Sequence, residues 1–239
     1  MNNDIKVLLS KAIKAAVDKY PAVIPFLGNR ARYLIAVPRA YKTYDYYLSE
    51  LTRMVKNLYA GFIGGEFIDI MASLIYGQLL QAYRQAWEEE GTGGEMPPYL
   101  VQSHEAMYLR QFDFVDQFYR DIVDARIDKT PIDPLLARCP LWANRWNEAH
   151  DEAIHLITMQ NGGKEIWTLG ATETHCPTCA ALNGIVAYAR EWDELGVRPQ
   201  NAPNDLLSCG GWNCDCERKP TEQRRSPKAY NSIMGIVSR

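Results

Sequence analysis

The sequence predicts a mainly α fold, in which a helical N-terminal region over residues 1–163 precedes a small α+β C-terminal subdomain. Three observations support this prediction. Apolar residues recur at three- and four-residue intervals up to Gln160, which is the period of an amphipathic helix. From Lys164 the pattern changes to the alternation that is typical of strands. Five of the six cysteines then fall between Thr174 and Arg218.

The first half of the helical region is expected to contain three helices. Residues 5–17 form an amphipathic pattern that Asn3 or Asp4 can cap, and the following Tyr20-Pro21 ends it. A second pattern covers residues 40–59. A third covers residues 66–90, after a break made by three closely spaced glycines: Gly61, Gly64 and Gly65.

Two more helices are expected before the change of period. Ser103 can cap the first of them, whose apolar positions continue to Val123. The second begins near Pro140, because proline suits a first helical turn, and continues to Gln160. The sequence Asn161-Gly162-Gly163 then ends the region with a glycine cap.

The C-terminal subdomain is predicted at residues 164–218. Alternating segments at 165–169 and 185–188 flank the turn signal Asn183-Gly184, which predicts a β-hairpin. Residues 191–195 predict one helical turn, and a short strand is expected from Glu217. Residues 219–239 are expected to form a frayed, basic tail.

The cysteines form two close-set groups. The first is Cys176-Pro-Thr-Cys179, and the second is Cys209-Gly-Gly-Trp-Asn-Cys214-Asp-Cys216. Each group presents sulfur atoms on one tight turn, which is the arrangement that a tetrahedral structural Zn²⁺ site needs. Pro177 fixes the backbone between the first two thiols, and Gly210 and Gly211 permit the positive φ angles of the second turn.

Five thiols compete for four positions on one ion. The preferred ligands are Cys176, Cys179 and Cys209, together with either Cys214 or Cys216. Disulfides and unconnected reduced thiols are the alternatives. Four further residues are not expected to bind metal. His175 is expected to be a surface or supporting residue, Cys139 a buried small hydrophobe, and His104 and His155 boundary residues of helices.

Composition and charge limit the class of protein. The formal net charge is −3, yet residues 217–239 carry six basic and two acidic side chains. This basic tail could contact phosphate or an acidic partner. The longest uncharged run, from Ile70 to Tyr83, is too short to span a membrane, and no secretory signal is visible. Use in the cytosol is expected, where clustered thiols favour metal over disulfide.

The C-terminal pattern resembles the phage Mu F-like head morphogenesis family, the minor head proteins of tailed phages and prophages. The similarity covers the segment from Trp167 through Cys176-Pro-Thr-Cys179 to Asn183-Gly184, and then Asn213-Cys214-Asp-Cys216. In that family a strand leads into Cys-x-x-Cys-x-x-Leu-x-Gly, and a later His-Pro-x-Cys-Arg-Cys closes the site. Here Gly211 replaces the family's histidine, Asp215 replaces its arginine, and Cys209 is expected to supply the missing ligand.

The resemblance implies a low-copy, non-enzymatic virion protein. Such a protein would associate with the portal or the major capsid protein, at the portal vertex or the capsid interior. It would be assembled in the bacterial host cytoplasm. The basic tail could make a nonspecific contact with packaged DNA.

Two other functions fit parts of the sequence. His150-Asp-Glu152 followed by Cys176 and Cys179 is similar to the motif of zinc-dependent deaminases, in which the metal activates water and the glutamate transfers its proton. A nonspecific DNA-binding zinc ribbon is the other alternative. The acidic residues between the two cysteine groups argue against sequence-specific binding by such a ribbon.

Overall fold

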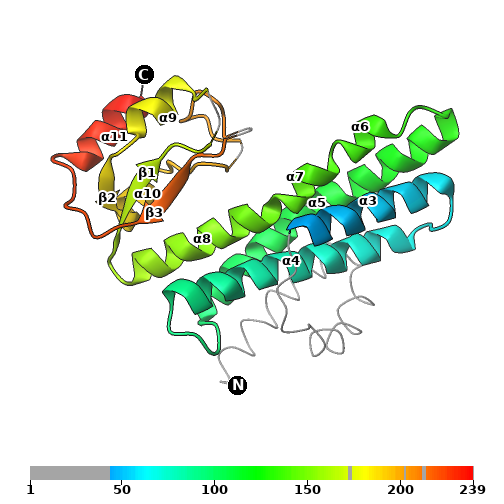
Figure 1. The fold of residues 1–239 in the computed structure, drawn as a ribbon, viewed down its shortest axis with the longest axis horizontal. Coiled ribbons are helices and arrows are strands. Elements are labelled where there is room, and N and C mark those ends of the chain that lie inside the picture. Colours follow the sequence, from blue (N-terminus) through cyan, green and yellow to red (C-terminus); the bar gives the residue numbers. More distant parts are fainter. Residues whose placement is uncertain (1–43, 172–173, 202, 212–213, 239) are drawn as a thin grey trace. The chain divides into compact units, whose positions relative to one another are not determined.

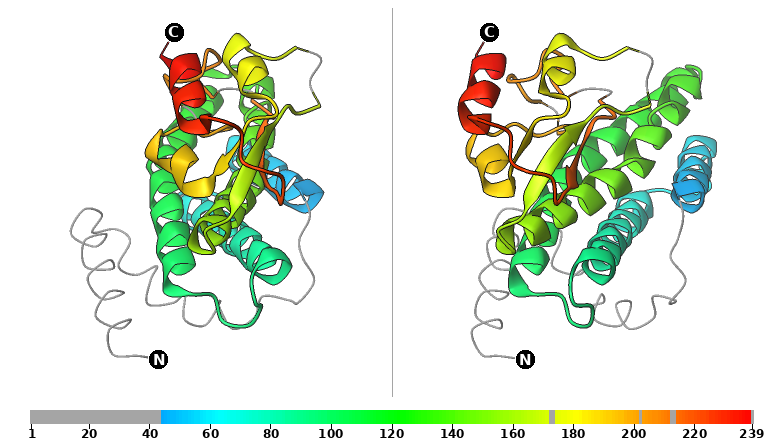
Figure 2. Two further views of the ribbon diagram at one scale, coloured as in Figure 1. Left: turned by 90° about the vertical axis from the view of Figure 1, so that its left-hand side faces the viewer. Right: turned by 60° about the vertical axis from the view of Figure 1, so that its left-hand side comes forward.

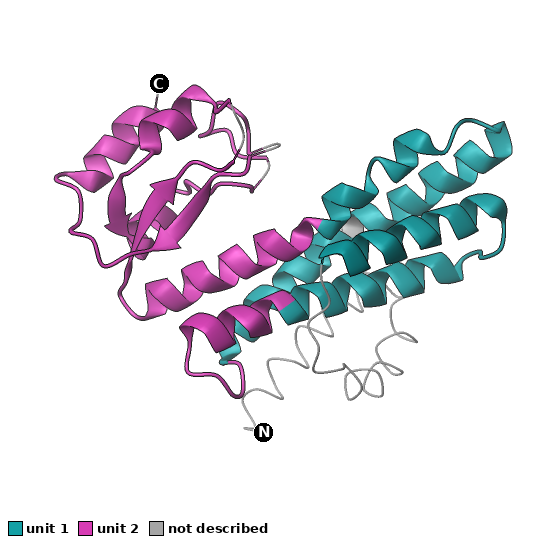
Figure 3. Ribbon diagram, in the orientation of Figure 1, with its two compact units in different colours: residues 1–81, 97–143 teal, residues 82–96, 144–239 magenta. Residues whose placement is uncertain are grey.

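The computed structural model describes residues 44–171, 174–201, 203–211 and 214–238. The helix predicted at residues 5–17 lies outside these ranges. The described chain is mainly helical with one small antiparallel sheet, so the predicted fold class is confirmed (Figure 1). It divides into two compact units, which comprise residues 1–81 with 97–143, and residues 82–96 with 144–239 (Figure 3).

The first unit is built from helices. Its elements are α3 (Tyr44–Ala60), the first part of α4 (Glu66–Glu90), α5 (Pro98–Asp128), α6 (Asp133–Leu136) and α7 (Cys139–Ala143). After the glycine break, α4 turns back beside α3 (Figures 1 and 2). The helix predicted from Ser103 begins five residues earlier, because Pro98 occupies its first turn.

Aromatic side chains fill the core of the first unit. The rings of Phe67 and Phe118 lie 6.2 Å apart, and Phe118 stacks at the same distance on Trp142. Cys139 is fully buried, as predicted. His104 is also buried and packs edge-on against Tyr76, so its prediction as a boundary residue is wrong.

The second unit contains a three-stranded antiparallel sheet in the order β2-β1-β3. Its strands are β1 (Lys164–Thr168), β2 (Val186–Tyr188) and β3 (Glu217–Pro220), with β1 paired to both neighbours. The helices are α8 (Arg145–Gln160), α9 (Pro177–Leu182), α10 (Ala189–Glu194) and α11 (Ala229–Val237). The predicted hairpin is therefore present, with α9 in its connection. The helix expected from Pro140 to Gln160 is interrupted at Asn144, which separates α7 from α8.

The tail is folded, contrary to prediction. Residues 229–237 form α11, which packs beside α9, and its Ala229 and Ile233 enter the apolar core of the second unit. That core also contains Trp167 and Trp192, whose rings are 5.6 Å apart. Burial of apolar side chains such as Ile233 thus stabilises α11 as a folded helix, although the segment before it is polar.

Buried charges join α8 to the sheet and to α10. Glu165 of β1 is fully buried, and its carboxylate lies 2.9 Å from His155 Nδ1 and 3.7 Å from Arg218 Nε of β3. The other ring nitrogen of His155 lies 3.7 Å from Asp193 of α10. His155 is consequently not a boundary residue. Because α8 packs on β1 and β3, the predicted division after residue 163 differs from the compact units, which place α8 with the sheet.

Three of the six basic residues of the predicted tail are ion-paired within the second unit. Arg218 pairs with Glu165, Lys219 with Glu217, and Arg225 with Glu191. The Arg225 guanidinium lowers the pKa of the Glu191 carboxyl. These pairs offset part of the excess positive charge counted along the sequence.

Substituting Arg218 with methionine should destabilise the second unit strongly. The change leaves the fully buried Glu165 carboxylate without its guanidinium partner, and breaking a buried pair costs about 3–5 kcal/mol. The matched control is Lys219→Met at the next position of β3, where the side chain is 59% exposed. Surface changes usually stay within about 0.5 kcal/mol. Urea unfolding followed by tryptophan fluorescence would measure both, and equal effects would contradict the structural role of Arg218.

Candidate metal centre

Three separate segments bring the five C-terminal cysteines together. Cys176 and Cys179 lie at the start of α9, Cys209 lies in the loop that follows α10, and Cys214 and Cys216 precede β3. Their sulfur atoms form two groups, Cys176 with Cys179 and Cys209, and Cys179 with Cys214 and Cys216. Within each group all sulfur atoms are within 4.8 Å of one another. The cluster could therefore hold a metal ion.

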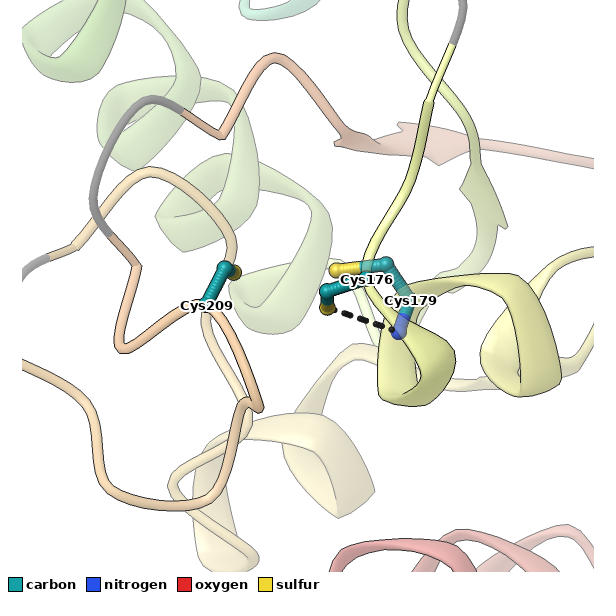
Figure 4. Close-up of side chains that lie close together, drawn as sticks. All are labelled: Cys176, Cys179 and Cys209. Carbon is teal, nitrogen blue, oxygen red and sulfur yellow. Dashed lines mark hydrogen bonds between the residues drawn. The ribbon is translucent and has the colours of Figure 1, made fainter.

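The first cysteine pair is fixed by a helix start. Cys176 is the N-cap of α9, Pro177 occupies the first turn, and the Cys179 amide donates to Cys176 Sγ at 3.3 Å. Figure 4 shows the two side chains beside Cys209, with this hydrogen bond drawn as a dashed line. The proline and the amide–sulfur bond place both sulfur atoms on one side of a tight turn.

The second cysteine group turns as the glycines predict. Gly210 and Gly211 have φ angles of 62° and 77°, which are readily available only to glycine. Burial raises the pKa of Cys209, and interaction with the Gly211 backbone opposes that rise. The pKa of Cys176 is lowered, because interaction with the Cys179 and Cys209 backbones outweighs the effect of burial. Backbone amides that point at sulfur stabilise thiolates, which are the form that binds metal.

Two polar contacts hold the groups in register. Thr178 Oγ1 lies 2.6 Å from Ser208 Oγ and accepts a hydrogen bond from the Ser208 amide at 3.2 Å, which ties α9 to the loop of Cys209. The Gln200 side chain donates a hydrogen bond to the Cys216 carbonyl at 3.0 Å. Sequence reasoning identified none of these three polar residues, because their partners are 16 to 30 residues away.

Without a cation, ionising several of these thiols is unfavourable, because their sulfur atoms lie close together. Cys179 and Cys214 have sulfur atoms 4.0 Å apart. Hydrogen bonding from Cys179 lowers the pKa of Cys214 to about 5. The same contact raises the pKa of Cys179, because its ionisation would place two negative sulfurs side by side. Burial raises the pKa of Cys209, and raises that of Cys216 to about 11. A divalent cation would compensate the thiolates that proximity disfavours.

The cysteine environment is continuous with the apolar core. Cys179 and Cys216 are buried among Trp167, Leu182 and their neighbours. All six cysteines are free thiols, so the disulfide alternative is not realised. All five predicted ligands lie in the cluster, whereas Cys139 belongs to the first unit. His175 is nearer to the cluster than expected, with Nδ1 lying 3.8 Å from Cys216 Sγ.

The residues of the deaminase alternative lie in other interactions. His150 stacks on Trp146, and its Nε2 lies 2.8 Å from Glu89. Glu152 receives hydrogen bonds from Arg198 at 3.2 Å. Neither residue belongs to a potential metal-ligand group among the described residues. The geometry therefore gives no support to a water-activating site at His150 and Glu152.

Comparison with protein-family models, curated proteins and solved structures finds no match to this chain. No helix in the described part of the chain is both long enough and apolar enough to cross a membrane. Inference of function therefore depends on the cysteine geometry and on the resemblance carried by the C-terminal motif.

Replacing Cys176 and Cys179 together with serine should remove the metal and loosen the C-terminal part of the chain. Two thiolates are lost from the cluster, and Cys179 also leaves the apolar core. Metal analysis and limited proteolysis would measure the effect, with cleavage expected after residue 163 and protection retained in α4 and α5. Cys139→Ser, outside the cluster, should keep the metal. Unchanged protease resistance in the double variant would argue against a structural ion.

Metal affinity should rise with pH across the neutral range. Cys179 and Cys209 have raised pKa values, so each must lose a proton when the ion binds. Cys214 is already a thiolate above about pH 5 and adds proton competition only below that value. Competition titrations with a chromophoric chelator at several pH values would test this. An affinity that does not change between neutral and mildly acidic pH would contradict thiolate ligation.

Proposed function

We propose that this protein is a structural minor head protein of a tailed phage or prophage, with a structural Zn²⁺ ion in its second unit. Its place would be the virion, at the portal vertex or the capsid interior, after assembly in the bacterial cytoplasm. The observation that supports this best is the convergence of Cys176, Cys179, Cys209 and Cys214 beside a small sheet. The paired cysteines and the closing Cys-x-Cys of the resembled family thus lie in one cluster.

A non-enzymatic role fits the chemistry of the cluster. Four thiolates satisfy a tetrahedral zinc ion, and structural zinc sites are closed in this way, whereas catalytic ones retain an open position. Sulfur ligands on turns stabilised by backbone amides also suit zinc better than Mg²⁺ or Ca²⁺, which prefer oxygen. The ion would fix a module whose sheet contains only three short strands.

The partner is proposed to be a protein. Of the predicted basic tail, Arg218, Lys219 and Arg225 are engaged by carboxylates within the unit. This leaves less free positive charge for duplex DNA than the sequence alone suggests. The portal protein or the major capsid protein is therefore the preferred partner, and contact with packaged DNA is secondary.

Co-expression with the portal and major capsid proteins of the same phage or prophage would test the assignment. Affinity purification of the tagged chain should retain one of them, and mass spectrometry of purified heads should detect the chain. The Cys176→Ser/Cys179→Ser variant should lose incorporation if the zinc module is required, while Cys139→Ser should keep it. Absence of the wild-type chain from heads, with no retained head protein, would overturn the proposal.

A further inference from the structure

A third group of potential ligands adjoins the cysteine cluster. His175, Asp215 and Cys216 offer an imidazole nitrogen, a carboxylate oxygen and a sulfur within 4.8 Å of one another. They come from two segments, one directly before α9 and the other directly before β3. Cys216 belongs both to this group and to the group with Cys179 and Cys214.

The spacing of this group matches shared coordination. Two ligands on one tetrahedral zinc, with a sulfur at about 2.3 Å and a nitrogen at about 2.0–2.1 Å, lie about 3.6 Å apart. Cys216 Sγ and His175 Nδ1 are 3.8 Å apart. By the same geometry two sulfurs on one zinc lie about 3.8 Å apart, and Cys179 and Cys214 are separated by 4.0 Å. Each of these two pairs thus has the spacing of two ligands that share one ion.

Gly170, which follows β1, allows Asp215 to approach the backbone closely. A Cβ atom at Gly170 would lie 2.1 Å from Asp215 Cγ and 2.2 Å from the Asp215 carbonyl oxygen, so only glycine permits this approach. The chain after β1 therefore leaves room for Asp215, which lies next to Cys216 in the sequence.

We infer that the second unit binds two divalent cations, the second of them at His175, Asp215 and Cys216. Cys176, Cys179, Cys209 and Cys214 hold the first ion, which resolves the surplus of five thiols. Charge favours this division, since a fifth thiolate beside a tetrathiolate zinc would add to a net charge of −2, whereas a second divalent ion neutralises Cys216 and Asp215. This proposal adds a second ion to the proposed zinc site at Cys176, Cys179, Cys209 and Cys214. It does not depend on a role in head assembly.

The second site suits a borderline cation such as Zn²⁺ or Co²⁺. Its nitrogen, oxygen and sulfur donors disfavour Mg²⁺ and Ca²⁺, which require oxygen ligands. Three protein ligands leave one position for water on a tetrahedral ion. The first ion has only sulfur ligands, so the two sites differ in spectroscopic signature.

Metal stoichiometry of the full-length protein tests the inference. After loading with zinc and dialysis against a weak chelator, elemental analysis and native mass spectrometry should give two ions per chain. His175→Gln and Asp215→Asn should each give one. The matched control is His150→Gln in the same unit, a histidine that belongs to no ligand group, which should keep two.

The outcomes separate the two proposed sites. A single ion in the wild-type chain would overturn the second site but not the four-cysteine site. Absence of any bound ion would overturn both sites. Unchanged stoichiometry in His175→Gln and Asp215→Asn would also overturn the second site. Loss of both ions in those variants would do so too, because it would assign the residues to the first site. In a cobalt titration, the first equivalent should give intense thiolate charge transfer and the second a weaker increment.

Discussion

The second unit depends on placing several sulfur atoms close together inside a small apolar core. Cys179 and Cys216 are buried with Trp167 and Leu182, and neighbouring sulfurs raise the cost of ionising them. Backbone amides stabilise part of that charge, notably at Cys176 and Cys209. A bound cation would remove the remaining repulsion and would join the three segments that carry the cysteines.

Buried charge is also used away from the cysteines. The carboxyl group of Glu165 is fully buried, and it lies beside His155 of α8 and Arg218 of β3. Burying a charged group without a partner costs free energy, because the group loses its hydration. The Glu165 pairs therefore add little net stability, and their main effect is to specify how α8 packs on the sheet. The cysteine cluster and the Glu165 group thus lie at different places in the second unit, and the Glu165 group joins α8, β1 and β3 through ion pairs.

The proposed head function and the proposed second ion rest on different observations. The first rests on a sequence motif whose cysteines converge in space. The second rests on the proximity of His175 to Asp215 and Cys216, and the resemblance assigns no ligand role to His175 or Asp215. A protein partner would meet a module whose tail is already folded as α11 and in which Arg218, Lys219 and Arg225 are ion-paired.

Periodicity in the sequence determined the helices of the first unit well. The pattern at residues 66–90 matches α4 residue for residue, because a long amphipathic stretch between a glycine break and an acidic end leaves little choice. The start of α5 and the division between α7 and α8 were missed. Local signals at Ser103 and Pro140 competed there with packing that only the folded chain reveals.

The sequence by itself determined the two cysteine-containing turns, since the close spacing of the cysteines with proline and glycine fixes each turn locally. Tertiary structure decided that the two turns meet, the roles of His155, Glu165 and Arg218, the docking of α11, and the approach of His175 to Asp215 and Cys216. These depend on contacts between residues 10 to 53 positions apart, as for His155 with Glu165 and Glu165 with Arg218. Local sequence patterns do not predict such contacts. Closing the intervening loops costs chain entropy, and only the packing of the whole unit offsets that cost.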